Sequence, residues 1–142
     1  MSELSENSTK PTPEETLQTL SRLSPYAWRV RENSVVIGKT RVGCAVLSKG
    51  GKIFTGCNVE HHFRCHDVHA EINALTTMVA EGERIANTLL IVAERIRFTP
   101  CGGCMDWIME FGGSNVIVAF QNAIGGEFDI HTAKELMPHY PE

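Results

Sequence analysis

The feature that most constrains the fold is a pair of short motifs far apart in the chain, His69-Ala70-Glu71 and Pro100-Cys101-Gly102-Gly103-Cys104. Together they offer one imidazole, two thiols and one further carboxylate. An imidazole and two thiols can form a three-ligand zinc site, whose fourth position stays open for water. We therefore expect a fold that brings the two motifs together, with Zn2+ held by His69, Cys101 and Cys104.

Composition is that of an ordinary globular chain. Its 142 residues suffice for one domain, with 42% hydrophobic and 21% charged residues. A net charge of -4 argues against a nucleic-acid partner and favours a small-molecule substrate. The sequence has no membrane-length apolar run and no secretory signal, so we expect no membrane partner and a cytoplasmic location. The 5 cysteines also argue against a disulfide framework.

Hydrophobic periodicity predicts a layered α/β domain over residues 14–142, preceded by a flexible tail over residues 1–13. A first helix is expected over 14–33, broken into two pieces by Pro25. Two antiparallel strands over 41–47 and 52–58 follow, joined by a glycine-containing turn. Next come a helix over 69–80 with Ile72, Leu75 and Val79 on its buried stripe, a strand over 87–94, a helix over 101–111, a strand over 115–120 and a short helix over 132–137.

The chemistry of the two motifs depends on where these helices begin. Cys101 and Cys104 are three positions apart, which places both thiols on one face at a helix start, where the helix favours thiolates. A C-x-x-C pair alone would fit a redox pair or two packed cysteines equally well, and His69 with Glu71 makes the zinc site the better interpretation. Glu71 does not share the helix face of His69, so we expect it beside the attacking water as the catalytic base and acid.

The same motifs match the H-x-E and P-C-x-x-C signature of zinc nucleobase deaminases. The segments Val42-Gly43-Cys44-Ala45-Val46 and Gly56-Cys57-Asn58-Val59-Glu60 further resemble the cytidine deaminase family. This resemblance implies a three-layer αβα fold with a central mixed β-sheet, and zinc-dependent hydrolysis of cytidine or deoxycytidine to the uridine product and ammonia. It also implies a place in pyrimidine salvage.

The resemblance also implies substrate-binding residues. Asn58 and Glu60 would bind the ribose hydroxyls, and Ala70 would contact the substrate beside them. The segment Glu135-Leu136-Met137-Pro138 resembles one in the small homotetrameric branch of the family, in which a following aromatic residue reaches a neighbouring subunit. Tyr140 is the candidate for that role here, and a homo-oligomer, with a tetramer favoured, is the expected assembly.

Some positions depart from the family pattern and leave the substrate open. Thr40 stands where the family usually has Phe, and the segment 61–67 carries three histidines and an arginine. That segment either contacts an anionic group of an unusual substrate or forms a polar loop or a contact between subunits. A deaminase of a modified cytosine nucleoside, such as the blasticidin S deaminases, is therefore an alternative. A noncatalytic zinc-binding protein and an editor of nucleic acid are weaker ones.

Overall fold

A single mixed β-sheet organises the chain. The computed structural model describes residues 10–96 and 98–141, so positions 1–9 of the predicted tail lie outside the described residues. The strands are β1 (Gly43–Ser48), β2 (Ile53–Cys57), β3 (Ala86–Val92), β4 (Ile117–Gln121) and β5 (Asp129–Thr132). They lie in the order β2-β1-β3-β4-β5. Only the β3–β4 pair is parallel among these strands, and the other neighbours are antiparallel.

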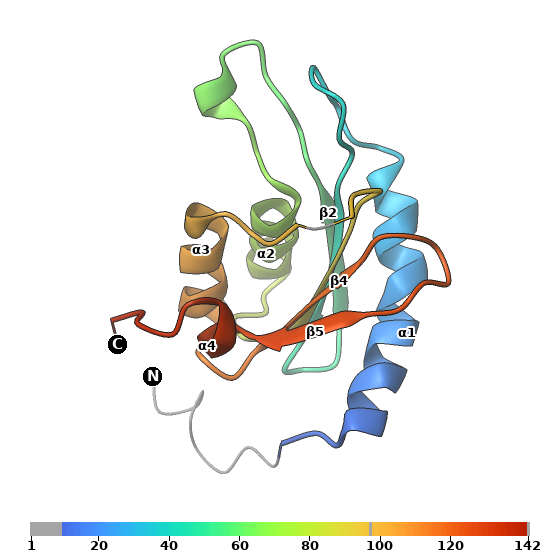
Figure 1. Cartoon of the computed structure of the whole chain (residues 1–142). Coiled ribbons are helices and arrows are strands. Elements are labelled where there is room, and N and C mark those ends of the chain that lie inside the picture. Colours follow the sequence, from blue (N-terminus) through green and yellow to red (C-terminus); the bar gives the residue numbers. More distant parts are fainter. Residues whose placement is uncertain (1–9, 97, 142) are drawn as a thin grey trace.

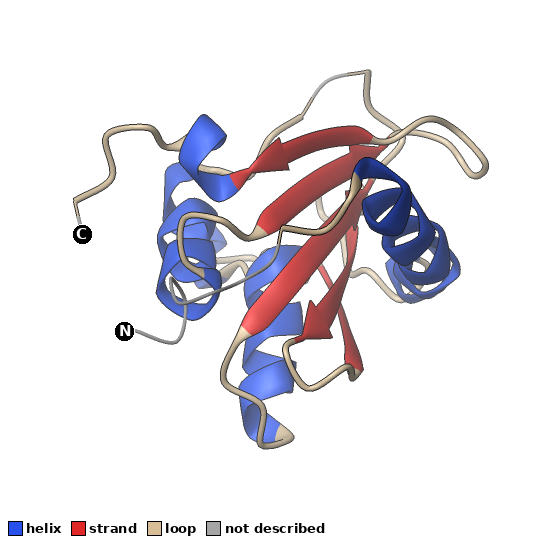
Figure 2. Ribbon diagram, turned by 90° about the horizontal axis from the view of Figure 1, so that it is seen from below, coloured by secondary structure: helices blue, strands red, loops and turns tan. Residues whose placement is uncertain are grey.

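Helices cover both faces of this sheet. They are α1 (Pro13–Arg31), α2 (Ala70–Ala80), α3 (Gly102–Gly112) and α4 (Ala133–Leu136), with a short 3-10 turn, η2 (Arg64–His66). Figures 1 and 2 show α1 on one face, with α2 and α3 side by side on the other. The predicted three-layer αβα fold with a mixed sheet is confirmed. Within the described part of the chain, no helix has the length and apolarity needed to span a membrane.

Pro25 does not break α1, contrary to the sequence prediction. The helix runs without interruption from Pro13 to Arg31. Side chains before and after the proline pack on the same sheet face: Leu20, Leu23, Ala27 and Trp28. In addition, Ser24 Oγ and Trp28 Nε1 both donate hydrogen bonds to Gln121 Oε1, at 2.6 and 2.8 Å. Packing on both sides of Pro25 thus outweighs the backbone hydrogen bond that a proline removes.

The buried stripe of α2 is rotated from the predicted one, because Ile72 and Val79 are only partly buried. The buried positions are Ala70, Glu71, Ala74, Leu75 and Met78. A Cβ atom on Gly56 of β2 would lie 2.3 Å from the backbone nitrogen of Ala74, so the small-residue side of α2 rests directly on the strand. Glu71 is among the buried residues of this helix.

The strand β5 was missed by the sequence analysis. It pairs antiparallel with β4 at the edge of the sheet, and its residues are exposed or only half-buried. A four-residue edge strand without a strong apolar alternation carries little pattern to detect. The other predicted strands and helices are present, with ends shifted by a few residues.

Candidate active site

The two sequence motifs meet at the starts of neighbouring helices. His69 is the N-cap residue of α2, and Cys101 is the N-cap residue of α3. His69 Nδ1 lies 3.2 Å from Cys104 Sγ and 3.5 Å from Cys101 Sγ. All three potential donor atoms lie within 4.8 Å of one another. The cluster therefore supplies three donors that can converge on a single metal ion.

The chemistry of these donors fits zinc. One imidazole and two thiols are soft to borderline ligands, which favour Zn2+ over the hard, oxygen-seeking Mg2+ and Ca2+. The backbone N–H of Cys104 points to Cys101 Sγ at 3.5 Å, as expected where a helix start supports a thiolate. Burial, and then the nearby Glu71, raise the pKa of the Cys104 thiol above its usual range. A bound cation reverses that preference, because a thiol deprotonates when it coordinates a metal.

Glu71 brings a buried carboxyl group to the same place. It lies in the first turn of α2 and is only 6% exposed. Burial raises the pKa of Glu71 above 4.5, while backbone hydrogen bonding, His69 and Cys104 partly oppose this shift. A carboxyl group with a raised pKa beside metal donors can both accept and return a proton, as general acid–base catalysis requires.

A cavity of about 360 Å3 opens beside these groups. Residues from several segments line it: Lys39, Thr40, Val42, Asn58, Glu60, Arg64, Asp67, Val68, His69, Ala70, Glu71, Ile91, Arg95, Phe98, Thr99 and Cys101. The structure thus gathers the predicted site residues in one cavity, apart from two. Cys104 is buried next to the cluster without lining the cavity, and Tyr140 lies elsewhere.

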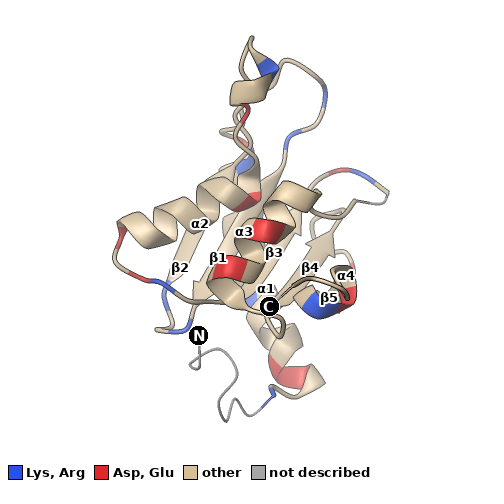
Figure 3. Cartoon of the chain, turned by 90° about the vertical axis from the view of Figure 1, so that its left-hand side faces the viewer, with Lys and Arg blue, Asp and Glu red and all other residues tan. Residues whose placement is uncertain are grey.

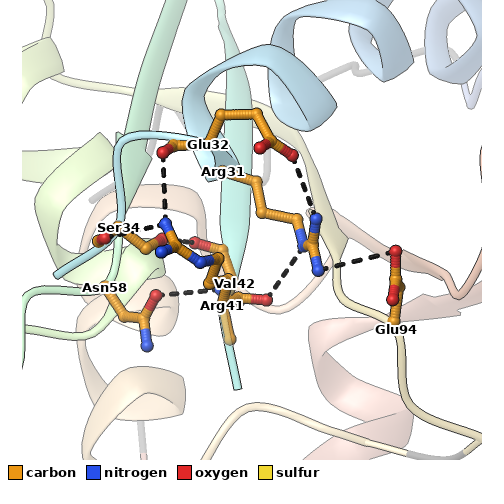
Figure 4. A network of polar contacts seen from close by, with 7 residues as sticks. All are labelled: Arg31, Glu32, Ser34, Arg41, Val42, Asn58 and Glu94. Atoms are coloured by element: carbon orange, nitrogen blue, oxygen red, sulfur yellow. Dashed lines mark hydrogen bonds and ion pairs between the residues drawn. The ribbon is translucent and has the colours of Figure 1, made fainter. Parts of the chain in front are cut away.

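Asn58 braces one wall of the cavity through its side chain, which is 7% exposed. Its Oδ1 accepts a hydrogen bond from the backbone N–H of Val42 at 2.8 Å. Its Nδ2 donates to the backbone carbonyl of Thr40, also at 2.8 Å. Both contacts fix the segment that brings Thr40 and Val42 to the cavity lining, and Figure 4 shows the contact with Val42.

Two arginines secure the same segment from outside the cavity. Arg41 Nη1 donates to the backbone carbonyls of Glu32 and Ser34, at 3.2 and 3.0 Å. Arg31 Nε donates to the carbonyl of Arg41 at 3.2 Å, and its guanidinium lies 3.7 Å from the Glu94 carboxylate (Figure 4). The cavity wall is therefore held by Arg31 of α1 and by the carbonyls of Glu32 and Ser34 after this helix, and Glu94 beyond β3 contacts Arg31.

Glu60 holds a second loop at the cavity. Its Oε1 accepts hydrogen bonds from the backbone N–H groups of Ile37 and Gly38, at 2.6 and 2.7 Å. Its Oε2 lies 3.4 Å from Arg64 Nη2. The bonds from Gly38 and Ile37 hold the pKa of Glu60 below 4.5. The group is therefore an ionised acceptor at neutral pH, with one oxygen directed to Arg64.

The histidine-rich segment forms a loop that projects from the body of the protein, drawn in green at the top of Figure 1. Asp67 closes it, accepting from the His61 N–H at 2.7 Å and from Arg64 Nε at 2.9 Å. Phe63 is 68% exposed and stacks on His61. Arg64 and Asp67 line the cavity, whereas the three histidines of the loop do not.

Sequence reasoning missed Phe98 and Arg95 as cavity residues. Both belong to the connection between β3 and Cys101, and their proximity to the Pro100-Cys101 motif was the only sequence signal that could have indicated them. Tyr140 sits on another side of α3, where its hydroxyl donates to Asp106 and its ring packs partly buried against the core. Within one chain it makes no part of the cavity.

Comparisons with known proteins point to one family. Residues 17–120 match the family model described as the cytidine and deoxycytidylate deaminase zinc-binding region. A cytidine deaminase of Sporosarcina psychrophila is 32% identical over 121 residues, which cover 84% of this chain and 88% of that protein. A probable cytidine deaminase of Dictyostelium discoideum is 39% identical over 79 residues, and the chain spans about half of that relative, 54% of its length.

A solved structure agrees with these matches. The crystal structure of the cytidine deaminase from Burkholderia pseudomallei has a TM-score of 0.76 and 28% identity, covering 84% of this chain and 96% of that one. The matched family region contains His69, Glu71, Cys101 and Cys104. On these grounds the chain belongs to the zinc-binding cytidine and deoxycytidylate deaminase family.

Proposed function

We propose that this chain deaminates cytidine and deoxycytidine by hydrolysis, giving uridine or deoxyuridine and ammonia. The observation that supports this most is the buried carboxyl group of Glu71, which lines the same cavity as His69 and Cys101. The family match supports the same activity, and the relative from Sporosarcina psychrophila is named a cytidine deaminase.

His69, Cys101 and Cys104 would hold the zinc ion. Two thiolates balance its charge while the imidazole stays neutral, so the donor set needs no additional cation. When bound, zinc supplies a water molecule of lowered pKa, which is the nucleophile of the reaction. The Glu71 side chain is buried and lines the same cavity as His69 and Cys101.

Glu71 moves the protons of the reaction. It takes a proton from the attacking water as the oxygen bonds to C4 of the cytosine ring, and it delivers that proton to N3. It then transfers the second proton of the water to the amino group, the C4–N bond breaks, and ammonia leaves. A raised pKa suits this role, because the carboxyl group must be protonated and deprotonated within one turnover.

The remaining predicted site residues would orient the nucleoside. Asn58 braces the wall formed by residues 40–42, and Glu60 keeps one oxygen directed to the cavity side occupied by Arg64. We infer that these two residues bind the ribose hydroxyls. Ala70 is the first residue of α2 and lines the cavity, and its backbone N–H, which has no acceptor within the helix, would donate to the base.

We further infer a homo-oligomer, with a tetramer favoured. Tyr140 makes no part of its own cavity, so its proposed substrate contact requires a neighbouring subunit. Trp107, 38% exposed and stacked on Phe111, adds an aromatic surface on the same helix that Tyr140 contacts. We also propose a cytoplasmic location, a role in pyrimidine salvage, and a division into a tail (1–13) and a catalytic domain (14–142).

A nucleic-acid substrate is not proposed. Along the ribbon in Figure 3, Lys and Arg positions are spread over several elements, as are the acidic positions. The net charge of -4 agrees with a small substrate.

Ammonia release by the zinc-quantified protein tests the proposal. The substrates are cytidine, deoxycytidine, cytidine 5′-monophosphate and blasticidin S, with Glu71→Ala as the blank. We expect turnover of both nucleosides and none in the variant. A zinc-loaded protein that leaves both nucleosides unchanged would contradict the proposed substrate. Turnover of blasticidin S alone would indicate that the substrate is a modified cytosine nucleoside.

A further inference from the structure

The described lining of the cavity beside Glu71 includes one large apolar aromatic ring. Among the described residues that line it, Phe98 is the only Phe, Tyr or Trp. Its other apolar lining, such as Val42 and Ile91, is aliphatic. A flat heterocycle gains most from contact with a flat ring, and an aromatic side chain can stack on any base because every base has a π-face.

The ring of Phe98 packs against the core but is only partly buried. It packs at 65° to the ring of Phe120, with 5.2 Å between the ring centroids. Phe120 lies in β4 and is 4% exposed, so this partner is itself fixed in the core. Phe98 itself is only partly buried and lines the cavity beside Glu71, so part of its side chain is open to another group.

Phe98 is close in the sequence to the donor residue Cys101. It stands three residues before Cys101, and Pro100 between them is buried. Phe98 also lines a neighbouring cavity of about 590 Å3 together with Phe120 and His131. Its side chain therefore forms part of the partition between the two cavities, and the first of these contains Glu71.

We propose that Phe98 is a specificity-determining residue whose ring stacks on the pyrimidine ring of the substrate. The contact would select planar bases and would hold C4 and N3 of the ring within reach of Glu71. This inference rests on the proposed function, because it concerns how a cytosine nucleoside is bound in that cavity. It predicts that the protein discriminates a planar pyrimidine from a saturated, puckered one.

Uridine and 5,6-dihydrouridine test the contact, since they share the ribose and differ in the planarity of the ring. Inhibition constants against cytidine turnover, and dissociation constants from calorimetry, are measured for the zinc-loaded wild type, Phe98→Leu and Phe98→Tyr. We expect Phe98→Leu to weaken uridine binding by about 10-fold, the range of base stacking, with less than a twofold change for dihydrouridine. Phe98→Tyr should restore the wild-type ratio of the two constants.

A change in the ratio of the uridine and dihydrouridine constants distinguishes stacking from a purely structural role, because a distorted cavity would weaken the binding of both ligands. Ile96→Ala is the matched control: the residue belongs to the same connection, is 92% exposed and does not line the first cavity. Zinc content and the unfolding temperature report whether each variant is intact.

Three results would overturn the inference. The first is a Phe98→Leu protein that still turns over cytidine with an unchanged ratio, and this leaves the proposed function standing. The second is a wild type that turns over cytidine but binds both ligands equally, which decides the matter even if Phe98→Leu fails to fold. The third, a wild type that neither binds uridine nor turns over cytidine, removes the proposed function as well.

Discussion

The two sides of the cavity are built in different ways. The metal-donor side is formed by side chains at two helix starts, His69 and Cys101, and by Cys104 one turn into α3. Another part of the lining, called the sugar side here because we propose that it binds the ribose, carries Asn58 and Glu60. Their side chains are engaged mainly with backbone groups of the segment 37–42.

This difference suggests that the donor side determines the reaction, whereas the sugar side determines the shape of the cavity. On the donor side, we propose that each side chain acts through its own chemistry, while the helix start positions it and supports a thiolate. On the sugar side, Asn58 and Glu60 first arrange the loops, and what remains of their hydrogen-bonding capacity is available to a ligand. Substitutions on the donor side should therefore abolish reaction, while those on the sugar side should change binding and stability together.

The largest effect is expected at the donor side from Cys104→Ser. A serine hydroxyl is a poor zinc ligand, so we expect loss of bound zinc, loss of turnover and a lower unfolding temperature. Metal analysis and thermal unfolding with and without added zinc measure this. Cys65→Ser is the control, because Cys65 is exposed and lies outside the donor cluster. Full zinc occupancy in Cys104→Ser would remove this residue from the proposed ligand set.

Glu71→Gln should break the reaction while keeping the metal. Gln is close in size to Glu but cannot carry a proton between water and base, and we expect kcat to fall by about 10³-fold. Glu81→Gln at the other end of the same helix is the matched control. Zinc content should equal that of the wild type in both variants. A Glu71→Gln enzyme within tenfold of wild-type kcat would contradict the acid–base role.

Gly56→Ala should disturb the placement of Glu71 through packing alone. A Cβ atom at Gly56 would meet the backbone of α2 at 2.3 Å, so the helix must shift. We expect a loss of about 1–3 kcal/mol in the free energy of unfolding, as for other overpacked sites, and a lower kcat. In Gly102→Ala, a Cβ atom meets nothing within 4 Å, so we expect no change in the free energy of unfolding or in kcat. Denaturant unfolding and steady-state kinetics of the two variants measure these quantities. Equal stabilities of the two variants would refute this packing argument.

The smallest effect is expected on the sugar side, where Glu60→Gln should lower stability in a pH-dependent way. Because the pKa of Glu60 is lowered in the folded protein, its ionised form contributes stability above the ordinary value of 4.5. That contribution is lost as the pH falls through the lower folded value. The difference in unfolding temperature between wild type and variant should therefore be present at pH 7 and should narrow below pH 4.5. A difference independent of pH would show that the charge has no part in it.

The donor side is encoded more locally in the sequence than the sugar side. The spacing of Cys101 and Cys104 on a helix start places both thiols together regardless of the rest of the fold. The backbone contacts of Asn58 and Glu60 join segments far apart in the chain, and no local pattern encodes them. The rotation of α2 is a further example, because it depends on the absence of a side chain at Gly56 on a different element.

Tertiary packing also explains the elements that sequence periodicity misjudged. Pro25 signals a break locally, but the hydrogen bonds to Gln121 and the buried face of α1 hold the helix together across it. The strand β5 gains its place from pairing with β4 rather than from its own composition. The role of Tyr140 stays a prediction, because it depends on a second subunit.

The donor cluster also has a bearing on how long the protein survives. His69 and Cys101 are 32 positions apart, so an ion bound between them would close a loop that contains α2 and β3. Ligands that bind only the folded state reduce the fraction of open molecules available to proteases. We therefore expect the lifetime of the chain to follow the supply of zinc, with the exposed residues 94–96 after β3 becoming the first site of cleavage when zinc is scarce.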